Sequence, residues 1–277
     1  MVPPRGSPCE ILLYNHPSMK VAAVQFCPKF KEKEENLRRL AGLIVAASKA
    51  GAVVVVLPEL CTTGYSFMSV AEALTEAELA APGGRTFDVM QALSRRFNIN
   101  ISWGMVERDA GTGDLYNSQV LITTHDGHIG YRKINKWGND FLWAKAGRAS
   151  PPILRTSFGR GPKQAPSLFD KFIERRLGLL ICRDVRDKSL NIADFYEKGD
   201  ADMVLMGANW GKGGFPAVAW MDFASSNNTS LIVANRWGIE SHNDFGFGGS
   251  CIIHPDGKVD TNGLVMGQDC IVTGDMV

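Results

Sequence analysis

Short apolar runs alternate along this chain with longer segments whose apolar positions recur every three to four residues. Residues 20–26 read Lys-Val-Ala-Ala-Val-Gln-Phe and residues 52–57 are wholly apolar, which favours strands in a buried sheet. Between them, residues 31–50 repeat leucine and isoleucine on one face and crowd charged side chains into the opening turns. This pattern predicts an amphipathic helix that ends at Gly51. Strand, helix and strand in this order predict a βα unit of a largely buried sheet.

The rest of the chain continues this mixture of strands and helices. We expect further strands at residues 100–108, 116–124, 129–133, 153–157, 177–181, 202–207, 230–234, 248–253 and 270–273. We expect helices over most of residues 76–97, after a break at residues 82–84, and again at residues 191–198 and 217–227. The Asp126-Gly127 pair predicts a hairpin turn, so antiparallel pairing follows the opening βα unit.

Domain organisation follows from the segments that interrupt this pattern. Residues 1–19 carry no apolar core of signal-peptide length, and we set them apart as a disordered leader or a cloning remnant. Residues 159–176 are polar and contain Pro and Gly, so we interpret them as an excursion between two strands. Because this excursion precedes the strand at residues 177–181, we expect it at the opposite end of that strand from Cys182. No Pro- or Ser-rich linker divides the remainder, so residues 20–277 are expected to form a single α/β domain.

The composition argues against several classes of function. With 30 Lys and Arg against 29 Asp and Glu, the net charge of +1 gives no electrostatic basis for binding nucleic acid or an anionic membrane. No segment approaches the ~18 consecutive apolar residues of a membrane span. The six cysteines are scattered without a Cys-x-x-Cys pair, which argues against a zinc site and fits reduced thiols in the cytoplasm.

Three predicted strands end close to side chains that can carry chemistry, namely Glu59, Lys133 and Cys182. Each also has an ordinary explanation, because a strand-end Glu or Lys is often only solvated and a Cys beside an apolar strand is often a small buried hydrophobe. Groups on different strands can, however, converge at one edge of a sheet. There Glu59 would take the thiol proton, Cys182 would attack a carbonyl carbon and Lys133 would stabilise the negative oxygen. This is the chemistry of acyl transfer through a thioester.

Six short motifs around these residues resemble those of one family. They are Leu57-Pro58-Glu59 with Thr63-Gly64-Tyr65, Tyr131-Arg132-Lys133, the run from Gly178 through Cys182 to Arg186, Asp202-Met-Val-Leu, Ala234-Asn235-Arg236-Trp-Gly238, and Gly248-Gly249-Ser250-Cys-Ile-Ile-His-Pro255-Asp-Gly257. Each motif is weak by itself. Their order and spacing over about residues 20–273 resemble the nitrilase superfamily of carbon–nitrogen hydrolases.

The resemblance implies an α-β-β-α sandwich, two copies of which pair into a four-layer homodimer or a higher homo-oligomer. It implies Glu59 as the base, Lys133 as the electrostatic stabiliser and Cys182 as the nucleophile. The backbone N–H of Arg183 would join Lys133 in the oxyanion hole. No metal and no organic cofactor are implied.

Departures from the family pattern bear on the site and the substrate. Many members carry a second glutamate seven residues before a glycine, and counting back from Gly147 reaches Asp140, whose arm is one methylene shorter. Asp140 is therefore a fourth catalytic candidate. For its shorter side chain to reach the site, either its loop lies further inward or a water molecule bridges the remaining distance. Arg183 and Asp184 after the cysteine resemble amidase-like branches, whereas Asp140-Phe-Leu-Trp143 resembles the loop of the nitrilase branch.

These features favour a hydrolase of a small linear amide or N-carbamoyl compound that releases ammonia or an amine. The alternatives are a nitrilase, which would use the same three groups, and a catalytically inactive binding protein on the same fold. The residues expected to bind the substrate are Tyr65, Trp137, Trp143, Arg183, Asn209 and Trp210. The tryptophans suggest a pocket with apolar walls, and the acyl group is left open.

Overall fold

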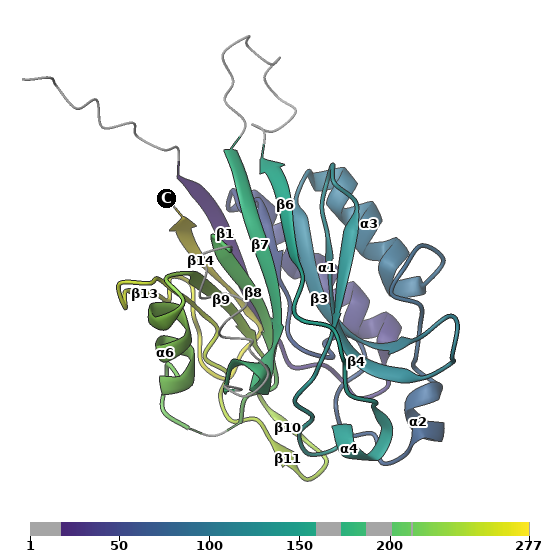
Figure 1. Cartoon of the computed structure of the whole chain (residues 1–277). Coiled ribbons are helices and arrows are strands. Elements are labelled where there is room, and N and C mark those ends of the chain that lie inside the picture. The colour runs from purple at the N-terminus through teal and green to yellow at the C-terminus, as the bar shows by residue number, and fades with distance from the viewer. Residues whose placement is uncertain (1–17, 159–172, 187–200, 212, 277) are drawn as a thin grey trace, which may run out of the picture.

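Two six-stranded sheets lie face to face in the computed structural model, which describes residues 18–158, 173–186, 201–211 and 213–276 (Figure 1). The first sheet contains β1 (Met19–Gln25), β2 (Val54–Val56), β3 (Asn100–Arg108), β4 (Leu115–Ile122), β5 (His128–Arg132) and β14 (Cys270–Met276). Its order is β14-β1-β2-β3-β4-β5. Within it β1, β2 and β3 run parallel, and the other pairings are antiparallel. The predicted βα unit and the predicted hairpin therefore lie side by side in one sheet.

The second sheet follows a similar plan with the later strands. It contains β6 (Ile153–Phe158), β7 (Ile173–Ile181), β8 (Met203–Ala208), β9 (Ser230–Asn235), β12 (Cys251–Ile253) and β13 (Val259–Asp260). Its order is β13-β12-β9-β8-β7-β6, with β7, β8 and β9 parallel. A separate ribbon is formed by β10 (Ile239–Glu240) and β11 (Asn243–Asp244). The parallel strands bring their carboxyl ends to a common edge, where functional side chains gather in α/β folds.

Helices cover the outer face of each sheet, so the expected α-β-β-α sandwich is confirmed (Figure 1). Helices α1 (Lys33–Lys49) and α3 (Arg85–Phe97) pack on the first sheet, and α6 (Val218–Ser226) packs against β9 and β12. Two short helices, α2 (Val70–Leu74) and α4 (Asp140–Trp143), contact each other beyond the end of β4. Across the described residues, no helix combines the length and apolar character needed to cross a bilayer.

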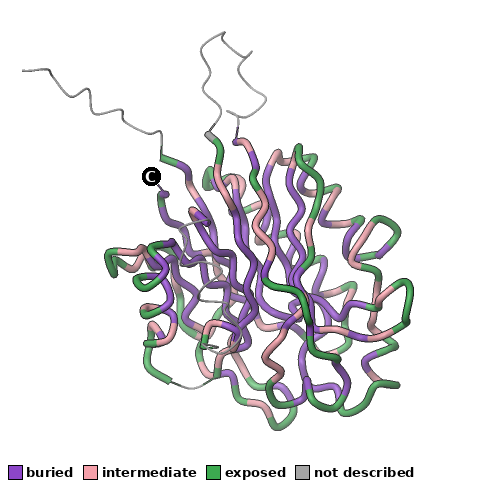
Figure 2. Tube along the Cα trace, viewed as in Figure 1, coloured by how far each residue is buried: buried purple, intermediate pink, exposed green. Residues whose placement is uncertain are grey.

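The packing of β2 explains why its sequence is apolar throughout. Val54 and Val56 belong to a cluster shared with the second sheet, whereas Val55 and Leu57 belong to a cluster shared with α1 and α3. The strand is thus covered on both faces, by the facing sheet on one side and by helices on the other. Figure 2 shows this pattern across the molecule, with buried residues along the strands and exposed residues on loops and outer helix faces.

The helix expected within residues 76–97, after the break at residues 82–84, is confirmed as Arg85–Phe97. Gly84 stands before it in an extended conformation, and an added Cβ there would lie 2.2 Å from the carbonyl oxygen of Leu79. This close approach turns the chain before the helix begins. The strand expected at residues 248–253 also shortens to Cys251–Ile253.

The polar excursion expected at residues 159–176 is shorter than predicted. Ile173 pairs with Phe158, and the register continues to the pair of Gly178 with Ile153, so β7 already begins at Ile173. The Phe158–Ile173 pair stands at the opposite end of β7 from Cys182. Residues 159–172, and the helix expected at residues 191–198, lie outside the described residues.

Candidate active site

Strands of both sheets end at one edge of the sandwich and carry the candidate residues there. Lys133 directly follows β5, Cys182 directly follows β7 and Asn209 directly follows β8. Glu59 lies three residues beyond the end of β2. Residues that are far apart in sequence are therefore brought to one place by the topology alone.

A buried ammonium group lies between two buried carboxylates at this edge. Lys133 Nζ donates to Glu59 Oε1 at 2.6 Å and to Asp140 Oδ2 at 2.7 Å, and none of the three side chains is more than 2% exposed. Burial alone would lower the pKa of Lys133, but the carboxylates of Asp140 and Glu59 raise it well above its ordinary value. Lys133 is therefore a fixed positive charge that is held on two sides.

Asp140 reaches this cluster directly in spite of its short side chain. It is the first residue of α4, and the backbone N–H of Trp137 donates to its Oδ2 at 3.0 Å. Of the two arrangements left open by the sequence, the structure shows the inward loop, since the contact with Lys133 needs no bridging water. The helical turn at Asp140 thus holds a carboxylate against the ammonium.

Asn117 completes the cluster, although none of the motifs includes it. Its Nδ2 donates to Glu59 Oε1 at 2.7 Å and to Asp140 Oδ1 at 3.1 Å, and its backbone carbonyl accepts from Lys133 N–H at 2.9 Å. One amide thereby bridges the same two carboxylates that the ammonium of Lys133 joins. The available signal is a run of three polar residues, residues 117–119, within a predicted strand, because buried polar groups need partners.

The backbone of Glu59 is enclosed by close packing from both sheets. A Cβ added to Gly104 on β3 would lie 2.6 Å from Glu59 Cα, and one added to Gly207 on β8 would lie 2.9 Å from Glu59 N. Only glycine allows these two strands to approach so closely. The second carboxylate oxygen, Oε2, accepts from the backbone N–H of Asn209 at 2.8 Å. Glu59 is therefore fixed through both of its oxygens.

Cys182 stands at a sharp turn between β7 and a 3₁₀ helix, η1 (Cys182–Arg186). Its φ of +44° lies in the left-handed region, which non-glycine residues adopt rarely and mostly where a site requires it. Burial and the charge of Glu59 raise the pKa of the thiol, against the opposing effects of Lys133 and a backbone hydrogen bond from Asn209. The thiol is therefore protonated at neutral pH and needs a base before it can act as a nucleophile.

A cavity of about 310 Å³ opens beside this thiol. Its lining residues are Trp137, Cys182, Arg183, Arg186, Asn209, Trp210 and Gly211. This volume lies at the lower end of the range for small-molecule sites. Among the residues that the structure describes, no group of His, Cys, Asp and Glu side chains is placed to hold a metal ion.

Comparison with known proteins agrees with this geometry. A family model described as carbon-nitrogen hydrolase matches residues 20–262. The chain belongs to the carbon–nitrogen hydrolase family. The resemblance of its motifs to the nitrilase superfamily is thereby confirmed.

Proteins similar to this hydrolase carry both nitrilase and amidase names. A probable nitrilase of Schizosaccharomyces pombe is 28% identical over 252 residues, which span 86% of this chain and 82% of the relative. An (R)-stereoselective amidase of a Pseudomonas species is 26% identical over 242 residues, which span 87% of this chain and 79% of the relative. The solved structure of a cysteine-to-serine variant of an amidase from Nesterenkonia AN1 matches this chain with a TM-score of 0.73 at 20% sequence identity. The match covers 94% of this chain and 92% of the amidase chain, so the two share a fold.

Asn209 lines the cavity of the hydrolase, but its side-chain amide is buried. The residue is 6% exposed, and neither Nδ2 nor Oδ1 has a hydrogen-bond partner among the described residues. A buried polar group without a partner costs free energy. The contact of Asn209 with the site is made by its backbone N–H, which holds Glu59.

Two of the residues expected to bind the substrate do not line this cavity. The hydroxyl of Tyr65 donates to the backbone carbonyl of Trp137, so Tyr65 supports a cavity wall from behind. Trp143 packs edge-on against Phe67, with ring centroids 5.8 Å apart, inside a separate buried cluster. Trp143 is therefore a core residue, because α4 turns its apolar side away from the cavity and into that cluster.

Asp184 is a buried carboxylate beside the site to which the motifs give no role. Its Oδ2 accepts from the Tyr131 hydroxyl at 2.8 Å and its Oδ1 accepts from the backbone N–H of Asn135 at 2.7 Å. Burial raises the pKa of Asp184 to about 6, although these hydrogen bonds and the charge of Lys133 act against the rise. Asp184 ties the turn that carries Cys182 to the segment that follows Lys133.

Proposed function

We propose that this carbon–nitrogen hydrolase cleaves a small linear amide or N-carbamoyl compound through a thioester on Cys182. The observation that carries the proposal is geometric, because Cys182 lines a small cavity at the sheet edge where Lys133 Nζ lies 2.6 Å from Glu59 Oε1. A neutral thiol, a carboxylate and an ammonium are the three groups that thiol-based acyl transfer needs.

In the first half of the reaction Glu59 accepts the thiol proton while the sulfur attacks the carbonyl carbon. The carbonyl oxygen becomes negative, and the ammonium of Lys133 and the backbone N–H of Arg183 stabilise it. Glu59 then gives its proton to the nitrogen, the carbon–nitrogen bond breaks, and ammonia or an amine leaves. The acyl group stays on the sulfur as a thioester.

In the second half a water molecule attacks the thioester carbon while Glu59 takes one of its protons. The carbon–sulfur bond breaks, the acid leaves, and the proton returns to the sulfur. Asp140 and Asn117 keep Glu59 and Lys133 in place during both halves through the contacts at 2.7–3.1 Å. Every step uses side chains and backbone groups of this chain, so the proposal includes no cofactor.

An amide is preferred over a nitrile because Arg183 and Asp184 follow Cys182, as in the amidase-like branches that the chain resembles. Structures of two variants of the similar Nesterenkonia amidase show acrylamide added to the active-site cysteine and bound butyramide. The nitrilase names of other relatives keep nitriles as the second candidate. With a nitrile, ammonia would leave only after the first water has entered.

Two further expectations belong to the same proposal. The described cysteines, Cys27, Cys61, Cys182, Cys251 and Cys270, are all free, which supports a reducing compartment such as the cytoplasm. A homodimer or a higher homo-oligomer rests on the resemblance to the family. Light scattering of the purified protein would measure its mass directly, and the mass of one chain would exclude the oligomer.

Ammonia release from a panel of amides, carbamoyl compounds and nitriles tests the proposal. The best compound should be hydrolysed by the parent and not by Cys182→Ala, because this variant loses the nucleophile. Cys251→Ala is the matched control, since Cys251 is equally buried but lies in β12 within the apolar core. It should keep its turnover and lose only stability. Near-normal hydrolysis by Cys182→Ala, or no hydrolysis of any compound by the parent, would exclude the proposed reaction.

A further inference from the structure

The cavity carries two positive charges that the proposed reaction does not use. Arg183 and Arg186 are both among its lining residues. They are three residues apart in η1, and side chains with this spacing lie on the same face of a 3₁₀ helix. The reaction needs only the backbone N–H of Arg183, so both guanidinium groups are left without a role.

Each guanidinium is held over the ring of a tryptophan that also lines the cavity. Arg183 Cζ lies 4.4 Å from the ring centroid of Trp137, and Arg186 Cζ lies 4.4 Å from the ring centroid of Trp210. Stacking occupies the flat face of a guanidinium and leaves the N–H donors on its edge available. The two tryptophans therefore hold two sets of donors in place at one opening.

No carboxylate balances these charges in the part of the chain that the structure describes, where neither arginine forms an ion pair. Asp184, which lies between them in sequence, accepts instead from Tyr131 and from the backbone of Asn135. Two like charges on one helix face repel each other, and an anion bound between them would relieve this repulsion.

We propose that Arg183 and Arg186 bind a carboxylate of the substrate, so that the hydrolase acts on short amides or carbamoyl compounds that carry an acid at the other end. This inference rests on the proposed function, because Cys182 marks the place of the scissile group. Planar guanidinium groups match the two oxygens of a carboxylate. A cavity of about 310 Å³ limits the substrate to a short compound.

Binding to the Cys182→Ala variant tests this inference without any turnover. Calorimetry compares succinamate with succinamide, which has the same length but a second neutral amide in place of the acid. The acid should bind at least about tenfold more tightly, the factor expected from one charge-assisted hydrogen bond. Adding Arg183→Gln and Arg186→Gln together should remove this preference and leave the affinity for the diamide unchanged within a factor of about three, since no charged contact is lost.

Arg96→Gln is the matched control, because Arg96 also lies over an aromatic ring, that of Phe97, but on the far side of the first sheet in α3. It should keep the full preference for the acid. Equal binding of the two compounds, a preference that survives in the double arginine variant, or no binding of succinamate at millimolar concentration would each overturn the inference.

Ammonia release by the parent chain separates this inference from the proposed function. If the parent hydrolyses amides but shows no preference for the acid, only the role of the arginines is refuted. If the Cys182→Ala variant prefers succinamate but the parent releases ammonia from no compound, only the hydrolysis is refuted.

Discussion

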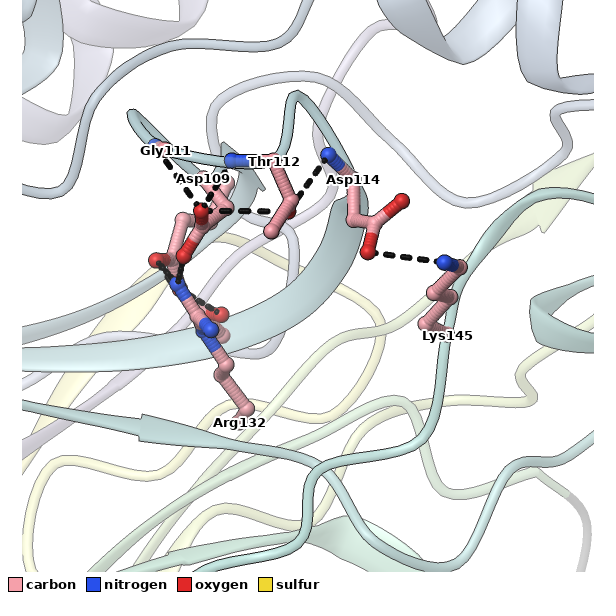
Figure 3. A network of polar contacts seen from close by, with 8 residues as sticks. Asp109, Gly111, Thr112, Asp114, Arg132 and Lys145 are labelled. Atoms are coloured by element: carbon pink, nitrogen blue, oxygen red, sulfur yellow. Dashed lines mark hydrogen bonds and ion pairs between the residues drawn. The ribbon is translucent and has the colours of Figure 1, made fainter.

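Two adjacent residues, Arg132 and Lys133, each hold a pair of carboxylates, but one pair lies at the surface and the other in the interior. The guanidinium of Arg132 contacts Glu107 and Asp109, and Arg132 Nη2 lies 2.6 Å from Asp109 Oδ2. The side chain of Arg132 is 33% exposed. Figure 3 shows this surface network around the turn that Asp109 closes, with the Asp114–Lys145 pair beside it. The side chain of Lys133 is 2% exposed and lies between its two carboxylates in the interior.

The difference in burial changes what the same arrangement of charges can do. Water and salt screen the Arg132 network, and exposed pairs of this kind add little to stability. Three charges buried around Lys133 lose their hydration, a cost that ion pairing does not reliably repay. A buried charged cluster that is costly for folding but linked by hydrogen bonds is typical of a functional site. The comparison therefore supports the proposed chemical role of Lys133 and favours a structural role for Arg132.

The largest expected effect separates these two neighbours. Lys133→Ala should lower the single-turnover acylation rate by a factor of about 10² to 10³, the usual loss when one oxyanion stabiliser is removed. Lys133→Arg should also fail, because a wide planar guanidinium cannot replace a compact ammonium between two carboxylates. Arg132→Gln should acylate at nearly the parental rate, since its guanidinium contacts Glu107 and Asp109, which lie outside the candidate site. Equal losses in the Lys133 and Arg132 variants would erase the distinction.

A smaller effect concerns the space around Asp140. Asp140→Glu should restore the longer arm that many relatives carry, yet lower the free energy of unfolding by about 1–3 kcal/mol, because it adds a methylene to a fully enclosed place. Asp114→Glu is the matched control, since Asp114 pairs with Lys145 at the surface and has room for the longer chain. Urea unfolding compares the four proteins formed by the parent, each variant and the double variant. A Glu at position 140 that leaves stability unchanged would mean that the loop adjusts freely.

An effect of similar size is a change in how stability depends on pH. Hydrogen bonds from Thr112 and Arg132 hold the pKa of Asp109 below its usual range, whereas burial raises the pKa of Asp184 to about 6. A raised carboxyl pKa means that the folded state binds the proton more tightly, so stability falls as pH rises from about 4 to about 6, by roughly 2–3 kcal/mol. Asp184→Asn should remove this part of the slope. Parallel pH profiles of the parent and the variant would show that Asp184 titrates normally.

The elements and site residues that follow from local pattern were predictable from the sequence. Glu59 and Cys182 stand just beyond apolar strands and Lys133 just beyond the second strand of the predicted hairpin, and the topology then brings these strand ends together. The position of Asp140 was indicated by its spacing from Gly147. Whether it touches Lys133 could not be read from the chain, because this depends on how far α4 lies inward.

The sequence alone did not indicate the roles of residues that depend on a partner far away in the chain. Asn117 bridges residues 58 and 23 positions away, and Asp184 accepts from residues 53 and 49 positions away, so no local spacing marks them. The two tryptophans of one loop behave in opposite ways, since Trp137 lines the cavity and Trp143 enters the core. Trp137 precedes the short helix α4 and Trp143 is its last residue, and the apolar pattern of four residues does not fix which face of that helix turns inward.

Mass spectrometry of the acylated enzyme tests the central claim most directly. The parent would be mixed with its best amide, quenched in acid within one turnover and digested. The account predicts that the peptide containing Cys182 gains the mass of the acyl group, at a rate no slower than turnover, and that Cys182→Ala shows neither adduct nor product. Full turnover with no adduct on that peptide, or an adduct on another residue, would contradict it.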